Sequence, residues 1–132
     1  MDHLVFPDGV KALTELIKGK EFAGHIVDAG TFVPKEAYDA IPTTPFVLIA
    51  TDGGNPGYVD QAEQLTLRVY AAGGVALPVA QAIKSAVVGD NIDTTIGFLD
   101  TIKCDRLPTV GSPTDTQDEA VLLLTVISRP IE

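Results

Sequence analysis

The sequence has few of the residues on which disulfides, metal clusters and stacking platforms depend. It contains one cysteine, Cys104, two histidines and no tryptophan, and aromatic residues make up 6% of the chain. One cysteine excludes both an internal disulfide and a cysteine-ligated metal cluster. The scarcity of aromatic rings argues against a surface that stacks on sugars or bases. Cys104 itself lies in an expected strand, where we interpret it as a small buried side chain.

Basic residues are also scarce. Nine Lys and Arg stand against 18 Asp and Glu, which gives a net charge of −9. Tight binding to nucleic acid phosphates needs clustered basic side chains, so it is not expected. No apolar run approaches the ~20 residues of a membrane-spanning helix, so no membrane partner is expected either. With 132 residues and 45% hydrophobic residues, the chain is expected to form a single domain over residues 1–132.

Recognisable catalytic motifs are missing as well. The chain lacks the phosphate-binding, dinucleotide-binding, Gly-x-Ser-x-Gly and His-Glu-x-x-His patterns. Gly53, Gly54 and Gly57 lie between two expected strands, which favours a hairpin turn over a phosphate site. Nothing in the sequence brings His3 or His25 to a serine for nucleophilic catalysis.

The acidic residues offer one alternative to an inert surface. Asp115 and Asp118 could bind a divalent cation, because hard cations take oxygen ligands. A solvated acidic loop is the favoured interpretation. The sequence thus predicts no catalytic residue, no cofactor and no metal site, and the chain is not expected to be an enzyme.

Residues 60–89 are expected to form a strand, a turn and a helix. From residue 64 to residue 71, apolar and polar residues alternate, which is typical of a half-buried strand. The Gly73-Gly74 pair then breaks the strand. Apolar residues at helical spacing follow, with Pro78 inside the start and Gly89 beyond the end of the expected helix.

The rest of the chain predicts one more helix and several strands. A helix after Asp8 has an apolar stripe that ends before Gly19. Residues 35–44 are ambiguous and could form a short helical turn. Strands are expected at residues 25–27, 31–33, 46–51, 63–71, 98–106 and 120–129. Residues 46–50 are expected to be covered on both faces, and residues 121–127, the most apolar strand, to lie centrally.

The segments between these elements are expected to be loops. Residues 52–60 and 107–118 are rich in Gly, Pro, Ser, Thr and Asp, so each is interpreted as a loop, and the second as a long one. Residues 90–95 are interpreted as a polar link. The resulting fold class is α+β, with a single mixed, mostly antiparallel β-sheet and two helices packed on one face.

The order of these elements resembles the tail terminator proteins of long-tailed bacteriophages. The likeness is carried by Leu67-Arg68-Val69-Tyr70-Ala71, by residues 80–88 and by Leu-Thr-Val-Ile-Ser-Arg-Pro at residues 124–130. It covers most of the chain except residues 22–44. The resemblance implies a hexameric ring that caps the tail tube, ends its growth and joins the tail to the head.

The resemblance also implies partners and a location. The partners are further copies of the chain, the tail tube protein and the head completion or stopper protein. Genomic DNA would pass through the channel without specific binding. The location is the virion, at the head–tail junction of the tail, after assembly in the host cytoplasm.

A closed ring needs heterologous contacts, for which strand edges and projecting loops are suited. Arg68 could pair with an acid of the next subunit or lie along its own sheet. An acidic channel wall would repel phosphates and let DNA slide. The candidate contacts with neighbouring subunits or the tube are Asp52, Asn55, Asp60, Arg68, Thr109, Asp115, Asp118 and Arg129.

Three other functions remain open on the sequence. The nearest is another head–tail connector, an adaptor or stopper protein, which differs from a terminator in the partner that it binds. A cytoplasmic small-ligand or regulatory module would be a stable monomer or dimer with an enclosed apolar pocket. An enzyme comes last, because candidates for nucleophile and base are too few.

Overall fold

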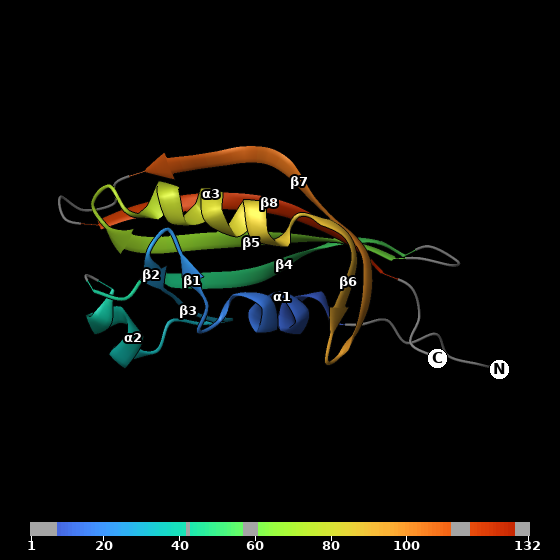
Figure 1. Cartoon of the computed structure of the whole chain (residues 1–132), viewed down its shortest axis with the longest axis horizontal. Helices are drawn as coiled ribbons and strands as arrows, with labels where there is room; N and C mark the ends of the chain where they lie inside the picture. Colours follow the sequence, from blue (N-terminus) through green and yellow to red (C-terminus); the bar gives the residue numbers. More distant parts are fainter. Residues whose placement is uncertain (1–7, 42, 57–60, 112–116, 129–132) are drawn as a thin grey trace.

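The computed structural model describes residues 8–41, 43–56, 61–111 and 117–128 (Figure 1). These residues form helices and strands of the α+β class that the sequence predicts. In chain order the elements are α1 (Gly9–Ile17), β1 (Glu21–Phe22), β2 (His25–Ile26), β3 (Asp28–Gly30), α2 (Lys35–Ala40), β4 (Phe46–Pro56), β5 (Gln61–Ala72), α3 (Ala76–Val87), β6 (Gly89–Thr94), β7 (Gly97–Gly111) and β8 (Gln117–Ser128).

The main sheet has six strands in the order β3-β4-β5-β8-β7-β6. β3 pairs with β4 in parallel, and each of the other neighbouring pairs is antiparallel. The mixed, mostly antiparallel sheet is therefore confirmed, and so is the central position of the apolar strand β8. β3 and β6 form the two edges. A separate two-stranded sheet, β1-β2, lies outside the predicted single sheet.

The core lies between one face of this sheet and the helices α1 and α3. In the two central strands, Leu65 pairs with Leu124 and Leu67 with Leu122, and none of the four is exposed. Leucines that meet across a strand pair on a covered face remove a large apolar area from water. On the helices, the core is formed by Ala12, Leu13, Ile17, Ala76, Val79, Ala80, Ile83 and Val87. The expected pair of helices on one face is confirmed.

Local signals explain where α1 begins and ends. The Asp8 carboxylate accepts hydrogen bonds from the backbone N–H of Val10 at 3.0 Å and of Lys11 at 3.2 Å. These donors have no partner within the helix, so the acid stabilises its first turn. Lys18 is already extended and Gly19 has a φ of 76°, a conformation that glycine adopts at low cost.

The expected loop at residues 52–60 is shorter than predicted. β4 continues to Pro56 and β5 begins at Gln61, while residues 57–60 lie outside the described residues. The strand passes its glycines through a bulge between Thr51 and Gly53, where Gly53 has a φ of 85°. Turn-forming residues in a strand are compatible with such a bulge, which the sequence pattern does not reveal.

The long loop expected at residues 107–118 is also wrong in extent. β7 continues to Gly111 and β8 begins at Gln117, so only residues 112–116, which are not described, lie between the strands. Two register shifts flank Arg106 and extend to Thr109. A proline without an N–H donor is tolerated at such irregularities, which explains how Pro108 lies within a strand.

Three further predictions need correction. Residues 90–95 are not a link, because β6 covers most of them as an edge strand. Residues 31–33 are not a strand; the short parallel strand β3 precedes them. Residues 46–50 are covered on both faces only at their start, since Phe46 is buried and Ala50 is exposed. The ambiguous segment 35–44 contains the short helix α2.

Candidate interaction surfaces

The predicted contact residues that the structure describes lie in different parts of the sheet. β4 ends and β5 begins at one end of the sheet, whereas β7 ends and β8 begins at the other end (Figure 1). Asp52 and Asn55 lie in β4, with side chains outside the described part. Asp60, Asp115 and Arg129 fall outside the described residues, so these contacts stay predictions.

Arg68 interacts with its own sheet. Its Nη1 lies 3.6 Å from Oε1 of Glu119 on the neighbouring strand β8. Burial raises the pKa of Tyr70, which pairs directly with Glu119, and a hydrogen bond with the Glu119 carboxylate raises the pKa further. The structure therefore shows the second of the two alternatives for Arg68. A half-exposed ion pair of this kind stabilises a fold by about 0–1 kcal/mol.

Asp118 and Thr109 have different surroundings. The Asp118 Oδ2 accepts a hydrogen bond from the backbone N–H of Gly74 at 2.7 Å, which ties the start of β8 to the turn before α3. Gly74 has a φ of 80°, as the predicted glycine turn requires. Thr109 is exposed on β7 opposite Val121. Asp118 thus has a role within the chain, and Thr109 remains accessible.

The second face of the sheet carries apolar side chains that the helices α1 and α3 do not cover. Along β8, buried and half-buried residues alternate, and Leu122, Leu124 and Val126 point into the core. Their neighbours Val121, Leu123 and Ile127 therefore point to the opposite face and are half-buried. We call this surface the uncovered face, and it includes Leu48, Ala50, Thr66, Arg68, Tyr70, Val121, Leu123, Thr125 and Ile127.

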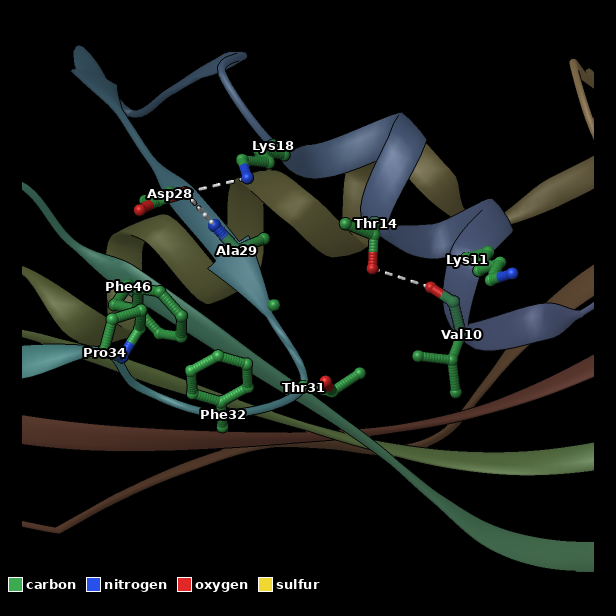
Figure 2. A pocket seen from close by; sticks show the side chains of 11 residues that line it. Val10, Lys11, Thr14, Lys18, Asp28, Ala29, Thr31, Phe32, Pro34 and Phe46 are labelled. Carbon is green, nitrogen blue, oxygen red and sulfur yellow. Dashed lines mark hydrogen bonds and ion pairs between the residues drawn. The ribbon is translucent and has the colours of Figure 1, made fainter. Parts of the chain in front are cut away.

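A hollow of about 370 Å³ lies beside the edge strand β3. Figure 2 shows that α1 forms one wall, whereas the chain after β3 and the first residue of β4 form the other. We call it the α1–β3 hollow. Its lining consists of Val10, Lys11, Thr14, Lys18, Asp28, Ala29, Gly30, Thr31, Phe32, Pro34 and Phe46. Phe32 is 69% exposed, so the hollow is open to solvent on this side.

Two ammonium groups lie at this hollow. The Lys18 Nζ lies 3.9 Å from Oδ1 of Asp28, and the same oxygen accepts the N–H of Ala29 at 2.9 Å (Figure 2). Lys11 is exposed and, among the described residues, has no carboxylate within salt-bridge distance. The Thr14 hydroxyl donates to the carbonyl oxygen of Val10 at 2.7 Å. Because the Asp28 carboxylate offsets the charge of Lys18, the hollow combines apolar walls with one positive charge, that of Lys11, which suits an anionic group attached to an apolar one.

The hairpin of β6 and β7 lies on the other flank of α1. The hydroxyl and the backbone N–H of Thr95 both donate to the carboxylate of Glu15. These hydrogen bonds hold the pKa of Glu15 below its usual value, and the bond from the hydroxyl has the larger effect. On the hairpin, Phe98 pairs with Asp93 and is 41% exposed.

The residues considered for catalysis are scattered. Among the described residues, no group of three or more His, Cys, Asp or Glu side chains is placed to hold a metal ion. His25 is half-buried on β2, and His3 lies outside the described residues. Cys104 lies in a strand as predicted but is only half-buried, and its Sγ is 3.0 Å from the carbonyl oxygen of Arg106.

The hollow and the hairpin were missed at the level of sequence. One signal for the hollow was present: Lys11, Thr14 and Lys18 recur at helical spacing and give an acidic chain one basic helix face. The hairpin carried no comparable signal, because residues 90–95 were interpreted as a link.

None of the helices in the described segments is long and apolar enough to span a membrane. Comparison with protein-family models and with curated proteins finds no match to this chain.

Proposed function

We propose that this chain is a structural protein of a bacteriophage tail, a terminator that assembles into a ring. The ring caps the tail tube, ends its elongation and joins the tail to the head completion proteins. It acts without catalysis, in the virion at the head–tail junction, after assembly in the host cytoplasm. The single observation that carries the proposal is the uncovered face of the sheet.

The composition of this face favours contact with another protein. Antiparallel sheets that face water on one side usually place polar residues there. β8 instead places Val121, Leu123 and Ile127 on its outer side, and Arg68 on β5 separates them from half-buried Leu48 on β4. Apolar side chains on a sheet face that no helix covers favour contact with another protein, although polar residues of β5 lie between them. A neighbouring subunit or the tail tube would remove these apolar side chains from water.

The charge of the chain is compatible with a channel for DNA. The net charge of −9 gives a ring of several copies a strongly negative surface. Phosphates are repelled by such a surface, so a duplex would pass without being held.

A small-ligand module is less well supported. Such a module needs an enclosed, mostly apolar pocket. The α1–β3 hollow is open at Phe32 and has two lysines at its margin. An adaptor or stopper protein shares the features of a terminator, so only the identity of the binding partner distinguishes the two functions.

A tube elongation assay tests the proposal. Tail tube protein from the same virus is polymerised with and without this chain, and tube lengths are measured by electron microscopy. We expect shorter tubes with one end that no longer grows when fresh tube protein is added. Unchanged elongation, together with binding to the portal-side proteins, would instead indicate an adaptor or stopper.

A matched pair of variants links this assay to the uncovered face. Leu123→Gln makes the face polar, and Val88→Gln makes the same kind of change at an exposed apolar residue after α3. We expect Leu123→Gln to lose the capping activity and Val88→Gln to keep it. Equal capping by both variants would show that capping does not depend on the uncovered face.

A further inference from the structure

The β6–β7 hairpin presents an aromatic ring next to a carboxylate. Asp93 and Phe98 are directly paired, so their side chains lie on the same face of the hairpin. The adjacent pair, Ile92 and Leu99, lies on the opposite face and packs on the core. Asp93 is exposed and Phe98 is 41% exposed. The outer face of the hairpin is therefore an apolar projection with a negative charge beside it.

The α1–β3 hollow has the complementary properties. Phe32, Pro34 and Phe46 supply apolar walls, and Lys11 supplies positive charge at the margin, where Asp28 offsets the charge of Lys18 (Figure 2). Its volume of about 370 Å³ is near the lower end of ligand pockets, about 300–1,000 Å³. That is a size for one aromatic side chain and its immediate neighbours rather than for a large cofactor.

The hairpin is attached to α1 beside the hollow of its own chain and not inside it. Residues on an α-helix are about 100° apart, so around α1 Glu15 differs from Val10 by about 140° and from Lys11 by about 40°. Val10 lines the hollow, whereas Glu15 holds Thr95 of the hairpin. In Figure 1 the hairpin accordingly lies beside α1 on a different side from β3. No residue of β6 or β7 lines the hollow of its own chain, so the projection would enter a hollow on a second molecule.

The distribution of charge supports this meeting. The charged residues that line the hollow are Lys11, Lys18 and Asp28, two basic and one acidic. β6 and the start of β7 carry only acidic charges: Asp90, Asp93 and Asp100. Two copies with a net charge of −9 repel each other in most orientations. Opposite charges at these two surfaces favour one orientation over the others.

We propose that the β6–β7 hairpin of one copy docks, through Phe98 and Asp93, in the α1–β3 hollow of a second copy. Because the two surfaces differ, the contact is heterologous, and its repetition produces a ring when the rotation closes. This inference rests on the proposed ring and identifies its lateral contact. The uncovered face remains available for the tail tube.

Disulfide trapping tests the contact directly. In a Cys104→Ser background, one preparation carries Phe98→Cys and another carries Phe32→Cys. We expect a cross-linked dimer when the two are mixed under mild oxidation. With Val88→Cys in place of Phe98→Cys, the yield should be at least roughly tenfold lower, because a disulfide requires Cα atoms about 4.4–6.8 Å apart. Efficient homodimers of Phe98→Cys alone would indicate a two-fold contact and contradict the proposal.

A charge exchange tests the role of the lysines. Asp93→Lys added to the Phe98→Cys chain should reduce the cross-link, and so should Lys11→Asp with Lys18→Asp in the Phe32→Cys chain. Mixing these two altered chains should restore it, since the charges are opposite again. Lys84→Asp on α3 makes the same kind of change away from the hollow and should leave the yield unchanged.

The results separate this contact from the ring itself. If the unaltered chain forms rings on tail tubes but neither the cross-link nor the charge exchange has an effect, the contact is wrong and the ring stands. If the unaltered chain does not associate at any concentration or on tubes, both are wrong. If phenylacetate shifts the resonances of hollow residues while association is unaffected, the hollow is a small-anion site and the proposal is overturned.

Discussion

Glu15 is the residue that ties α1 to the β6–β7 hairpin. Its carboxylate accepts both donors of Thr95, and these hydrogen bonds favour the charged form, so its pKa in the folded chain is lower than the ordinary value of 4.5. A lowered pKa means that the stabilisation is complete above the ordinary value and is lost as the pH falls through the folded value. Glu15 thus makes the attachment of the hairpin sensitive to acid.

We predict that Glu15→Gln lowers the free energy of unfolding at neutral pH and that this difference shrinks as the pH falls below about 4.5. Urea unfolding at a series of pH values measures it. Glu21→Gln, at an exposed position of β1, removes the same charge and should show no such pH-dependent loss. A difference between Glu15→Gln and the unaltered chain that stays constant into the acid range would contradict the role of Thr95.

The start of α1 depends on another single carboxylate. Asp8→Ala removes the acceptor for two backbone N–H groups and should cost about 1 kcal/mol of unfolding free energy. Asp8→Asn keeps a side-chain oxygen in the same place and should cost much less. Chemical denaturation of both variants decides the matter. Equal losses would mean that the charge of Asp8, rather than its hydrogen bonds, supports the helix.

Single residues were predictable where the local pattern determines them. Asp8 at the helix start and the glycine turn at Gly74 follow from backbone chemistry within a few residues. The partner of Arg68 did not follow, because Glu119 is 51 positions away in the chain and only the pairing of β5 with β8 brings it close. Residue roles that depend on pairing between distant strands cannot be read from local sequence.

At the level of the element, β8 shows how its two faces differ. Leu122→Ala should cost about 2–5 kcal/mol, because Leu122 is fully buried between β5 and the helices. Leu123→Ala, one residue later, should cost clearly less, because its side chain lies half-buried on the uncovered face. Thermal or urea unfolding of the two variants compares them. Equal costs would mean that the second face is covered in the isolated chain.

The elements in the interior were predicted better than those at the edge. α1, α3, β5 and β8 have a clear apolar period because one side of each meets the core. β6 has no such signal, since this edge strand is mostly polar and only Ile92 packs against the core. β4 contains glycine and β7 contains proline at irregularities in the strand pairing. Because these residues are typical of loops, the sequence predicted loops where the two strands continue.

At the scale of the whole molecule, the surfaces depend on the assembled fold. The α1–β3 hollow takes residues from a helix, an edge strand, the following segment and the start of β4, from Val10 to Phe46. Helical spacing indicated the basic face of α1 but not the apolar wall opposite it. The uncovered face likewise appears only when the helices are known to lie on one side of the sheet.

The three surfaces are compatible with the assembly that we propose. The hairpin and the hollow are different surfaces of the chain, so the proposed contact between copies would be heterologous, as a ring requires. The uncovered face belongs to the other side of the sheet and is free for a different partner. A terminator needs both kinds of contact, one with its own copies and one with the tube.

Electron microscopy of tail tubes incubated with this chain tests the central claim most directly. We predict a closed ring of six copies at one end of each tube, with the uncovered face against the tube and the β6–β7 hairpin of each copy in the hollow of the next. The chain alone should show few rings, because a terminator that closes without a tube caps nothing. Tubes with bare ends, alongside a chain that stays monomeric in their presence, would contradict the account.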